Sequence, residues 1–71
     1  MPKLYSSEII RKVLQKIGFL LVSQKGSHAK FRNHTGRTVI LPMNKKEIPI
    51  GTFRSILRQA GIDTEAFENN L

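Results

Sequence analysis

The sequence predicts an α+β fold with the element order α-β-β-β-α, in which two helices cover one face of a three-stranded antiparallel sheet. Two observations predict it. Apolar residues recur at three- and four-residue spacing near both ends of the chain, as they do in amphipathic helices. Between these segments, three short runs rich in β-branched and aromatic residues are separated by turn residues, which is typical of a strand meander. The apolar stripes and the sheet share one core only when both helices lie on the same face.

The first helix is predicted over residues 7–17. Ser6 and Ser7 are both suitable N-cap residues, and Glu8 in the first turn interacts favourably with the helix dipole. Gly18 follows the last periodic position, where a left-handed C-terminal residue favours glycine. The polar residues of this segment oppose one apolar stripe, which consists of Ile9, Ile10, Val13, Leu14 and Ile17.

Three strands are predicted over residues 19–24, 27–32 and 37–41, and the turn residues 25–26 and 33–36 separate them. Pro42 ends the third strand, because proline has no backbone N–H to donate. Successive side chains of a strand point to opposite faces, so His28, Lys30 and Arg32 share one face of the second strand. The opposite face of that strand holds Ser27, Ala29 and Phe31.

A polar loop is predicted over residues 43–50, and its length makes it a candidate functional loop. Gly51 and Thr52 open a second helix that ends at Gly61, with Arg54 and Arg58 facing outward. Asp63 is expected to cap a short turn over residues 64–67 that folds its apolar residue onto the core. The expected core is formed by the stripe of the first helix together with Phe19, Leu21, Phe31, Val39, Leu41, Phe53, Ile56, Leu57, Ala60 and Phe67.

Size and composition exclude several classes of protein. The 71 residues predict a single domain, residues 1–71. The chain has no cysteine, which excludes a disulfide scaffold and a zinc site built on thiolates. The longest apolar run is residues 19–22, far short of a membrane span, and the first residues lack the layout of a signal peptide. We therefore expect a soluble, cytoplasmic protein that does not bind a membrane.

Charge is distributed unevenly along the chain, whose net charge is +7. Residues 1–46 carry ten basic side chains and one acidic one, whereas residues 47–71 carry two basic and four acidic ones. A basic surface of this kind suits a phosphate backbone or an acidic protein, and the alternative is a solvated surface that only confers solubility. RNA is favoured over DNA because neither helix carries the polar side chains that read bases in a major groove. The candidate phosphate-binding cations are Lys25, Lys30, Arg32, Arg37, Lys45 and Lys46.

His28 is the best candidate for catalysis, since it shares a strand face with Lys30 and Arg32. Histidine is the side chain that most readily accepts and donates protons near neutral pH. Cleavage of RNA through the 2′-hydroxyl needs such a group beside positive charge. Spacing alone nevertheless favours a surface histidine that contacts phosphate without chemistry.

His34 lies in a turn, where histidine is tolerated for backbone reasons. No spacing typical of metal ligands or of a nucleotide-cofactor fingerprint occurs, so we expect neither a metal nor a cofactor.

Two segments carry a resemblance to a known family: residues 26–31, Gly-Ser-His-Ala-Lys-Phe, and residues 51–62, which begin Gly-Thr-Phe-Arg-Ser-Ile-Leu. Together with Gly18-Phe19 and Pro42, they make residues 6–67 resemble the HicA toxin family. The resemblance implies a fold like that of double-stranded-RNA-binding domains, ribosome-independent cleavage of mRNA, and neutralisation by a HicB antitoxin encoded beside the toxin. It also implies that His28 of the Gly-Ser-His element is catalytic, which reverses the preference from spacing alone. Ser27 beside it is a further candidate RNA-binding residue.

The chain departs from the family pattern at Asn44. Many relatives carry a second histidine shortly after the proline that ends the third strand, and asparagine cannot exchange protons. If that histidine contributes to catalysis in relatives, activity in this chain is reduced or rests on His28 alone. Three functions therefore stay open: an endoribonuclease toxin, a non-catalytic RNA-binding module, and an adaptor whose basic face docks an acidic protein.

Overall fold

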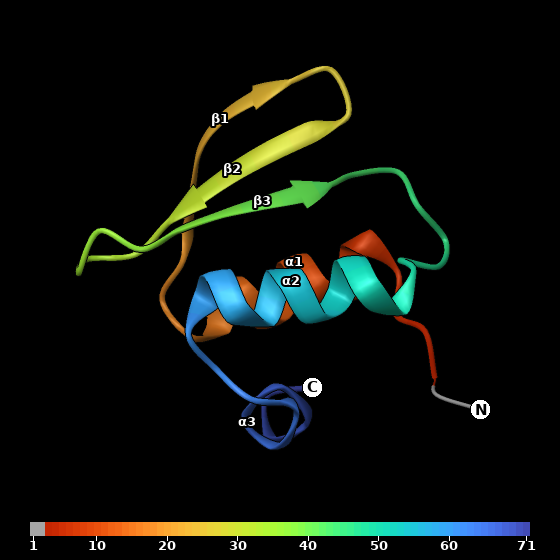
Figure 1. Ribbon diagram of the computed structural model, residues 1–71. Coiled ribbons are helices and arrows are strands. Elements are labelled where there is room, and N and C mark those ends of the chain that lie inside the picture. The colour runs from red at the N-terminus through yellow and green to blue at the C-terminus, as the bar shows by residue number, and fades with distance from the viewer. Residues whose placement is uncertain (1–2) are drawn as a thin grey trace.

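A computed structural model describes residues 3–71, with the order helix, three strands, helix, helix. Figure 1 shows the sheet on one side of the molecule and the helices on the other. The predicted α+β class and the α-β-β-β-α order are confirmed, and the arrangement is consistent with a fold like that of double-stranded-RNA-binding domains. The elements are α1 (Ser7–Lys16), β1 (Leu20–Lys25), β2 (His28–Arg32), β3 (Thr38–Pro42), α2 (Ile50–Ala60) and α3 (Thr64–Asn69).

Side-chain caps fix where the first and last helices begin. The Ser6 hydroxyl accepts the N–H of Ile9 at 3.2 Å and is the N-cap of α1, so Ser7 is the first helical residue. Asp63 caps α3 as predicted, because its carboxylate accepts the Ala66 N–H at 2.8 Å. The helix α3 runs two residues beyond the predicted turn. Among residues 3–71, no helix has both the length and the apolar composition needed to cross a membrane.

The sheet is an antiparallel meander in the order β1-β2-β3, so β2 is the central strand. His28 lies opposite Lys25 on β1 and opposite Pro42 on β3. The pairing of β1 with β2 shifts register between Leu21 and Ser23, which indicates a β-bulge. The two flanking strands therefore place their ends beside the first residue of β2.

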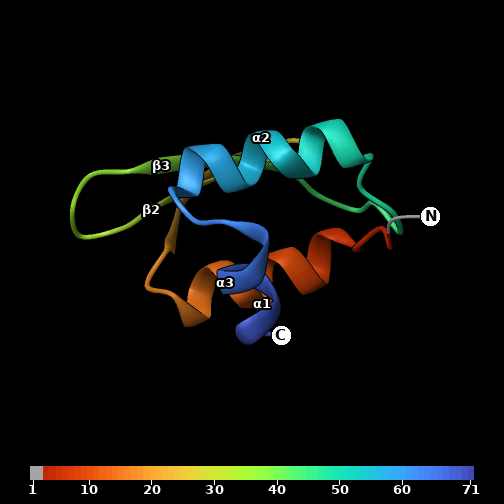
Figure 2. The same ribbon diagram turned by 60° about the horizontal axis from the view of Figure 1, so that its bottom comes forward.

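One hydrophobic core lies between the inner face of the sheet and the helices. Its most deeply buried large side chains are Phe19, Phe31, Phe67, Ile10, Leu14, Leu41, Ile48 and Ile56. An aromatic cluster joins the two ends of the chain: the ring centroid of Phe67 lies 4.9 Å from those of both Tyr5 and Phe53. Figure 2 shows α3, which carries Phe67, on the side of α1 and α2 that is remote from the sheet. The short helix α3 is therefore held by its aromatic residue.

The prediction that Leu21 belongs to the core is wrong, since this residue is 50% exposed. Its register partner Phe31 is buried, so Leu21 does point to the inner face of the sheet. The helices, however, pack chiefly against β3, and Figure 1 shows β1 as the strand farthest from α2. The inner face of β1 is therefore uncovered. Ile9, predicted in the buried stripe of α1, is likewise 39% exposed because it lies at the margin of that stripe.

Candidate nucleic-acid interface

The face of β2 that points away from the helices carries three polar side chains in a row: His28, Lys30 and Arg32. All three are exposed, whereas Ala29 and Phe31 between them are buried, which confirms the alternation predicted from sequence. Neighbouring members of the row are about 7 Å apart along the strand. We call this side of the sheet the outer face. It presents one histidine and two cations to solvent on the central strand.

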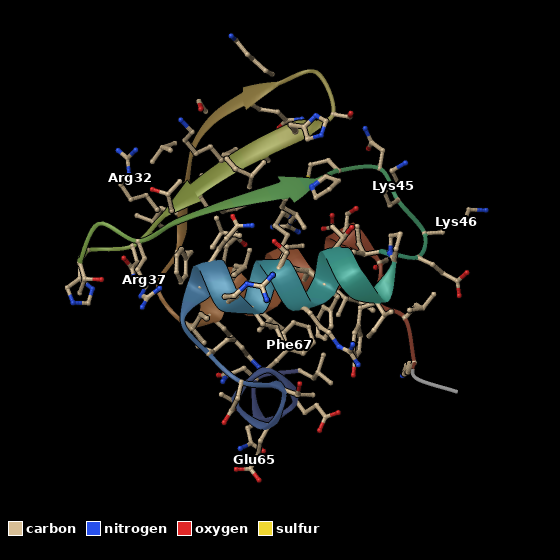
Figure 3. The ribbon with its side chains drawn as sticks, viewed as in Figure 1. Arg32, Arg37, Lys45, Lys46, Glu65 and Phe67 are labelled. Atoms are coloured by element: carbon tan, nitrogen blue, oxygen red, sulfur yellow. The ribbon has the colours of Figure 1, made fainter. Side chains whose placement is uncertain are left out.

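The turn and the loop at one end of the sheet surround His28. Lys25 lies directly opposite on β1, and Ser27 occupies the turn between the two strands. The Ser27 carbonyl accepts the N–H of Met43 at 2.6 Å. The loop of residues 43–46 therefore starts next to the first residue of β2, which is His28. Figure 3 shows Lys45 and Lys46 on this loop, with Lys46 pointing away from the rest of the molecule. Chain topology thus gathers Lys25, Ser27, Lys45 and Lys46 at the end of the sheet that carries His28.

Arg37, which was predicted to reach phosphate, lies elsewhere. Its guanidinium donates a hydrogen bond to the carbonyl of Gln59 at 3.1 Å, at the C-terminal end of α2. It packs so closely on Gly61 that a Cβ atom at that position would lie 2.6 Å from the Arg37 Cζ. Figure 3 shows Arg37 directed toward the end of this helix, and Arg32 directed away from the helices. Arg37 therefore caps α2, where a cation is favoured by the helix dipole.

Among residues 3–71, the cations of the outer face form no ion pair with an acidic side chain. Within residues 3–71, one ion pair is formed, and it joins Glu8 to Arg11 on α1. The hydrogen bond from Arg11 lowers the pKa of the Glu8 carboxyl below its ordinary value. Of the other four acids, Asp63, Glu65 and Glu68 belong to α3 or its cap, and Figure 3 shows Glu65 pointing away from the sheet. The fourth, Glu47, follows Lys46 in the loop and is exposed. Positive charge on the outer face is thus available to an anionic ligand.

A buried serine that the sequence indicates only as an N-cap candidate, Ser7, holds the loop in place. Ser7 is 2% exposed, and its hydroxyl donates to the Pro42 carbonyl at 2.6 Å and accepts the Lys45 N–H at 3.0 Å. Its backbone N–H donates to the Lys45 carbonyl at 3.0 Å. The first residue of α1 therefore fixes both sides of the turn at residues 42–45. Residues 6–8 and 43–46 line a surface hollow of about 410 Å³ at this junction.

Asn44 lies at the tip of this turn with a φ of 64°, and its side chain is exposed. This left-handed conformation is uncommon for residues other than glycine, but asparagine adopts it more readily than most. The backbone thus gives a local reason for an asparagine here. Its amide can donate and accept hydrogen bonds but cannot exchange protons, so this position offers no acid–base chemistry.

Replacing Ser7 by alanine is expected to lower the free energy of unfolding by about 1–3 kcal/mol. The change leaves the Lys45 N–H and the Pro42 carbonyl without a buried hydrogen-bond partner. Urea titration followed by circular dichroism measures the loss. Ser23→Ala on the exposed strand β1 is the matched control and should stay within about 0.5 kcal/mol of the wild type. Equal stability of the two variants would show that Ser7 does not anchor the loop.

Other parts of the surface offer less chemistry. His34 is exposed in the turn after β2, at the end of the strand opposite to His28. A hollow of about 750 Å³ between α1 and the C-terminal residues is lined by apolar side chains, three lysines and amides. Within residues 3–71, no three His, Asp or Glu side chains come together in a group that can hold a metal ion. The outer face around His28 is where an exposed histidine and several lysine and arginine side chains lie close together.

Comparison with known protein families finds a match over residues 7–62 to the family described as HicA toxin of bacterial toxin-antitoxin. The match covers well over half of the 71-residue chain. It includes α1, all three strands and α2, and therefore every candidate site residue, while α3 lies outside it. Comparison with curated proteins finds no match.

Proposed function

The chain belongs to the HicA toxin family, and from this premise we propose that it is a ribosome-independent endoribonuclease that cleaves mRNA. Membership makes it a toxin of a toxin–antitoxin pair, in a family whose members are in general ribonucleases. The observation that carries the proposal is the position of His28: exposed on the central strand, opposite Lys25, and beside a loop bearing Lys45 and Lys46. The catalytic role of His28 is the part that needs an experiment.

The proposed chemistry uses His28 as general base and general acid. In cleavage through the 2′-hydroxyl, the base removes the proton of that hydroxyl as its oxygen attacks the phosphorus. The bond from phosphorus to the leaving oxygen breaks, and a proton returns to that oxygen. Lysine side chains near the scissile phosphate stabilise the charge that builds up on its oxygens. His28 is the one group at this end of the outer face whose side chain suits both proton transfers near neutral pH.

RNA is proposed to lie across the outer face and the adjoining loop. The contacting residues are those that share this surface: Lys25, Ser27, Lys30, Arg32, Lys45 and Lys46. Arg37 is left out of the set because its guanidinium is engaged at the end of α2. No Phe or Tyr ring is exposed among residues 3–71, so contacts to phosphate should supply most of the affinity.

RNA binding is expected to depend strongly on salt. If four or five of these cations contact phosphate, log K should fall against log salt with a slope of roughly −3 to −3.5 for single-stranded RNA. Fluorescence anisotropy over a KCl series measures the slope. Lys30→Ala should make it shallower by about 0.7, whereas Lys16→Ala on α1 should not change it. Binding that is independent of salt would contradict this placement of RNA.

We further propose that a HicB-like antitoxin binds through an acidic surface and covers His28. Opposite charges accelerate the encounter of the two proteins, and a bound protein over the outer face keeps RNA away from the histidine. An RNA substrate that still reaches His28 in the complex would argue against this mode of neutralisation.

The decisive test is incubation of the purified protein with a labelled transcript, with and without EDTA. Cleavage in both conditions is expected, because proton transfer by histidine needs no metal ion. Asn44, at the place where many relatives carry a second histidine, favours a non-catalytic RNA-binding module as the second candidate. That function gives retardation of the transcript without cleavage, while absence of binding at low salt would leave only a protein-docking role.

A further inference from the structure

The two edge strands of the sheet differ in whether their outward backbone groups have hydrogen-bond partners. At the edge formed by β3, the backbone N–H of its central residue Ile40 donates to the side-chain oxygen of Gln59 at 2.9 Å. The Gln59 amide is held in turn by the Ser55 hydroxyl at 3.1 Å. Helix α2 thus occupies the middle of this edge with a polar side chain. At the other edge, β1 pairs with β2 alone in the part of the chain that the structure describes.

The open edge also exposes a run of large apolar side chains. Leu20, Leu21 and Val22 are consecutive in β1 and are 68%, 50% and 48% exposed. Edge strands that must stay unpaired are usually short or carry charged side chains. In β1 the one charge, Lys25, lies at the end of the strand. An open edge with adjacent exposed apolar residues is a typical feature of surfaces that accept a strand from another protein.

We propose that β1 accepts an acidic strand of a partner protein, which adds to the sheet as a fourth strand. This inference rests on the proposed function, under which the partner is the antitoxin. The occupant is a protein because every Phe and Tyr ring of the described chain is buried and the large exposed side chains of β1 are aliphatic, which leaves no aromatic platform for nucleic-acid bases on this strand. It is acidic because the chain carries a net charge of +7 and its neighbouring outer-face cations lack acidic partners. A second copy of the chain would bring like charges together.

The register of the sheet defines what the added strand must carry. Leu20, Ser23 and Lys25 share the outer face with Arg32, Lys30 and His28 respectively, and Leu21 lies on the inner face. The partner strand therefore needs apolar side chains beside Leu20 and Leu21, and a carboxylate beside Lys25 on the outer face. Strands in a sheet are about 4.8 Å apart, which puts the partner roughly 10 Å from β2. A protein anchored there is close enough to cover His28.

The test uses the full chain and the HicB-like protein encoded beside its gene. In Leu21→Glu and Val22→Glu, a negative charge replaces an exposed apolar side chain on the edge and repels an acidic strand, so affinity for the partner should fall at least about tenfold. Ile9→Glu makes the same change at an exposed residue of α1 and should alter affinity less than about twofold. Amide exchange followed by NMR should show protection of alternate β1 amides in the complex, because only every second N–H of an edge strand points outward.

Affinity unchanged in both edge variants, or protection confined to residues 42–46 and His28, would overturn the proposal. So would a dimer of the free chain that Leu21→Glu dissociates, since the edge would then be occupied by a second copy. Loss of affinity with alternating protection of β1 supports it. RNA cleavage by the free variants provides the separate readout: it should match that of the wild type. Absence of cleavage in the wild type would contradict the endoribonuclease assignment but would not bear on the proposed role of β1.

Discussion

Replacing His28 by alanine is expected to abolish RNA cleavage and toxicity while leaving the fold and most of the RNA affinity intact. General acid–base catalysis typically contributes about 10²–10⁴ in rate, which is enough to silence a toxin. His28 is exposed, and the inward residues of its strand are Ala29 and Phe31, so its truncation opens no cavity in the core. Lys30 and Arg32 remain on the same face to hold phosphate. Affinity should therefore weaken by little more than one contact.

A gel assay with labelled transcript measures the rate, and growth after induction measures toxicity. His34→Ala is the matched control, because this histidine is also exposed but lies in the turn at the other end of β2. The control should cleave like the wild type. A 2′-deoxy substitution at the scissile nucleotide should block cleavage by the wild type, as the proposed chemistry needs that hydroxyl. Near-normal cleavage by His28→Ala would refute the assignment and direct attention to Asn44, His34 and the two lysines of the loop.

Truncation of Phe67 should have the largest effect on stability. The side chain is 1% exposed, and its ring contacts those of Tyr5 and Phe53 at centroid distances of 4.9 Å. Phe67→Ala is expected to cost about 3–5 kcal/mol, the sum of lost apolar burial and a residual cavity. A chain of this length is stable by roughly 4–10 kcal/mol in total, so the variant should lose at least about a third of its stability.

Thermal and urea unfolding followed by circular dichroism measure this loss. Glu65→Ala, on the same helix but exposed, should change the free energy of unfolding by less than about 0.5 kcal/mol. Phe67→Leu keeps most of the apolar volume and should fall between the two. If Phe67→Ala unfolds at the same urea concentration as Glu65→Ala, α3 does not contribute to the core, and the aromatic cluster has no energetic role.

The fold was largely predictable because its signals are local. The three- and four-residue spacing in α1 and α2, and the alternation from His28 to Arg32, gave the elements and the faces that they bury. Leu21 was assigned wrongly because alternation reports which face a residue points to, and not whether a helix covers that face. Coverage depends on how far α1 and α2 extend beneath the sheet, which no local pattern encodes.

The same distinction applies to the candidate site. The row of His28, Lys30 and Arg32 follows from strand periodicity alone. The roles of Ser7 and Arg37 do not, because their hydrogen-bond partners are 35, 38 and 22 residues away in sequence. Two adjacent serines at the start of α1 offered two equivalent caps. Only the tertiary structure decides that Ser6 caps the helix and that Ser7 holds the loop.

The hydrogen bond between Gln59 and Ile40 also bears on how the chain behaves at high concentration. Filaments grow by sheet pairing only if each copy has two free edge strands, so that it can pair with one neighbouring copy on each side. Here the edge at β3 is occupied by a side chain of α2, so pairing through β1 uses up the single edge that is open. Any self-association of this kind ends as a closed pair of chains, because neither copy retains an edge from which a fibre can propagate.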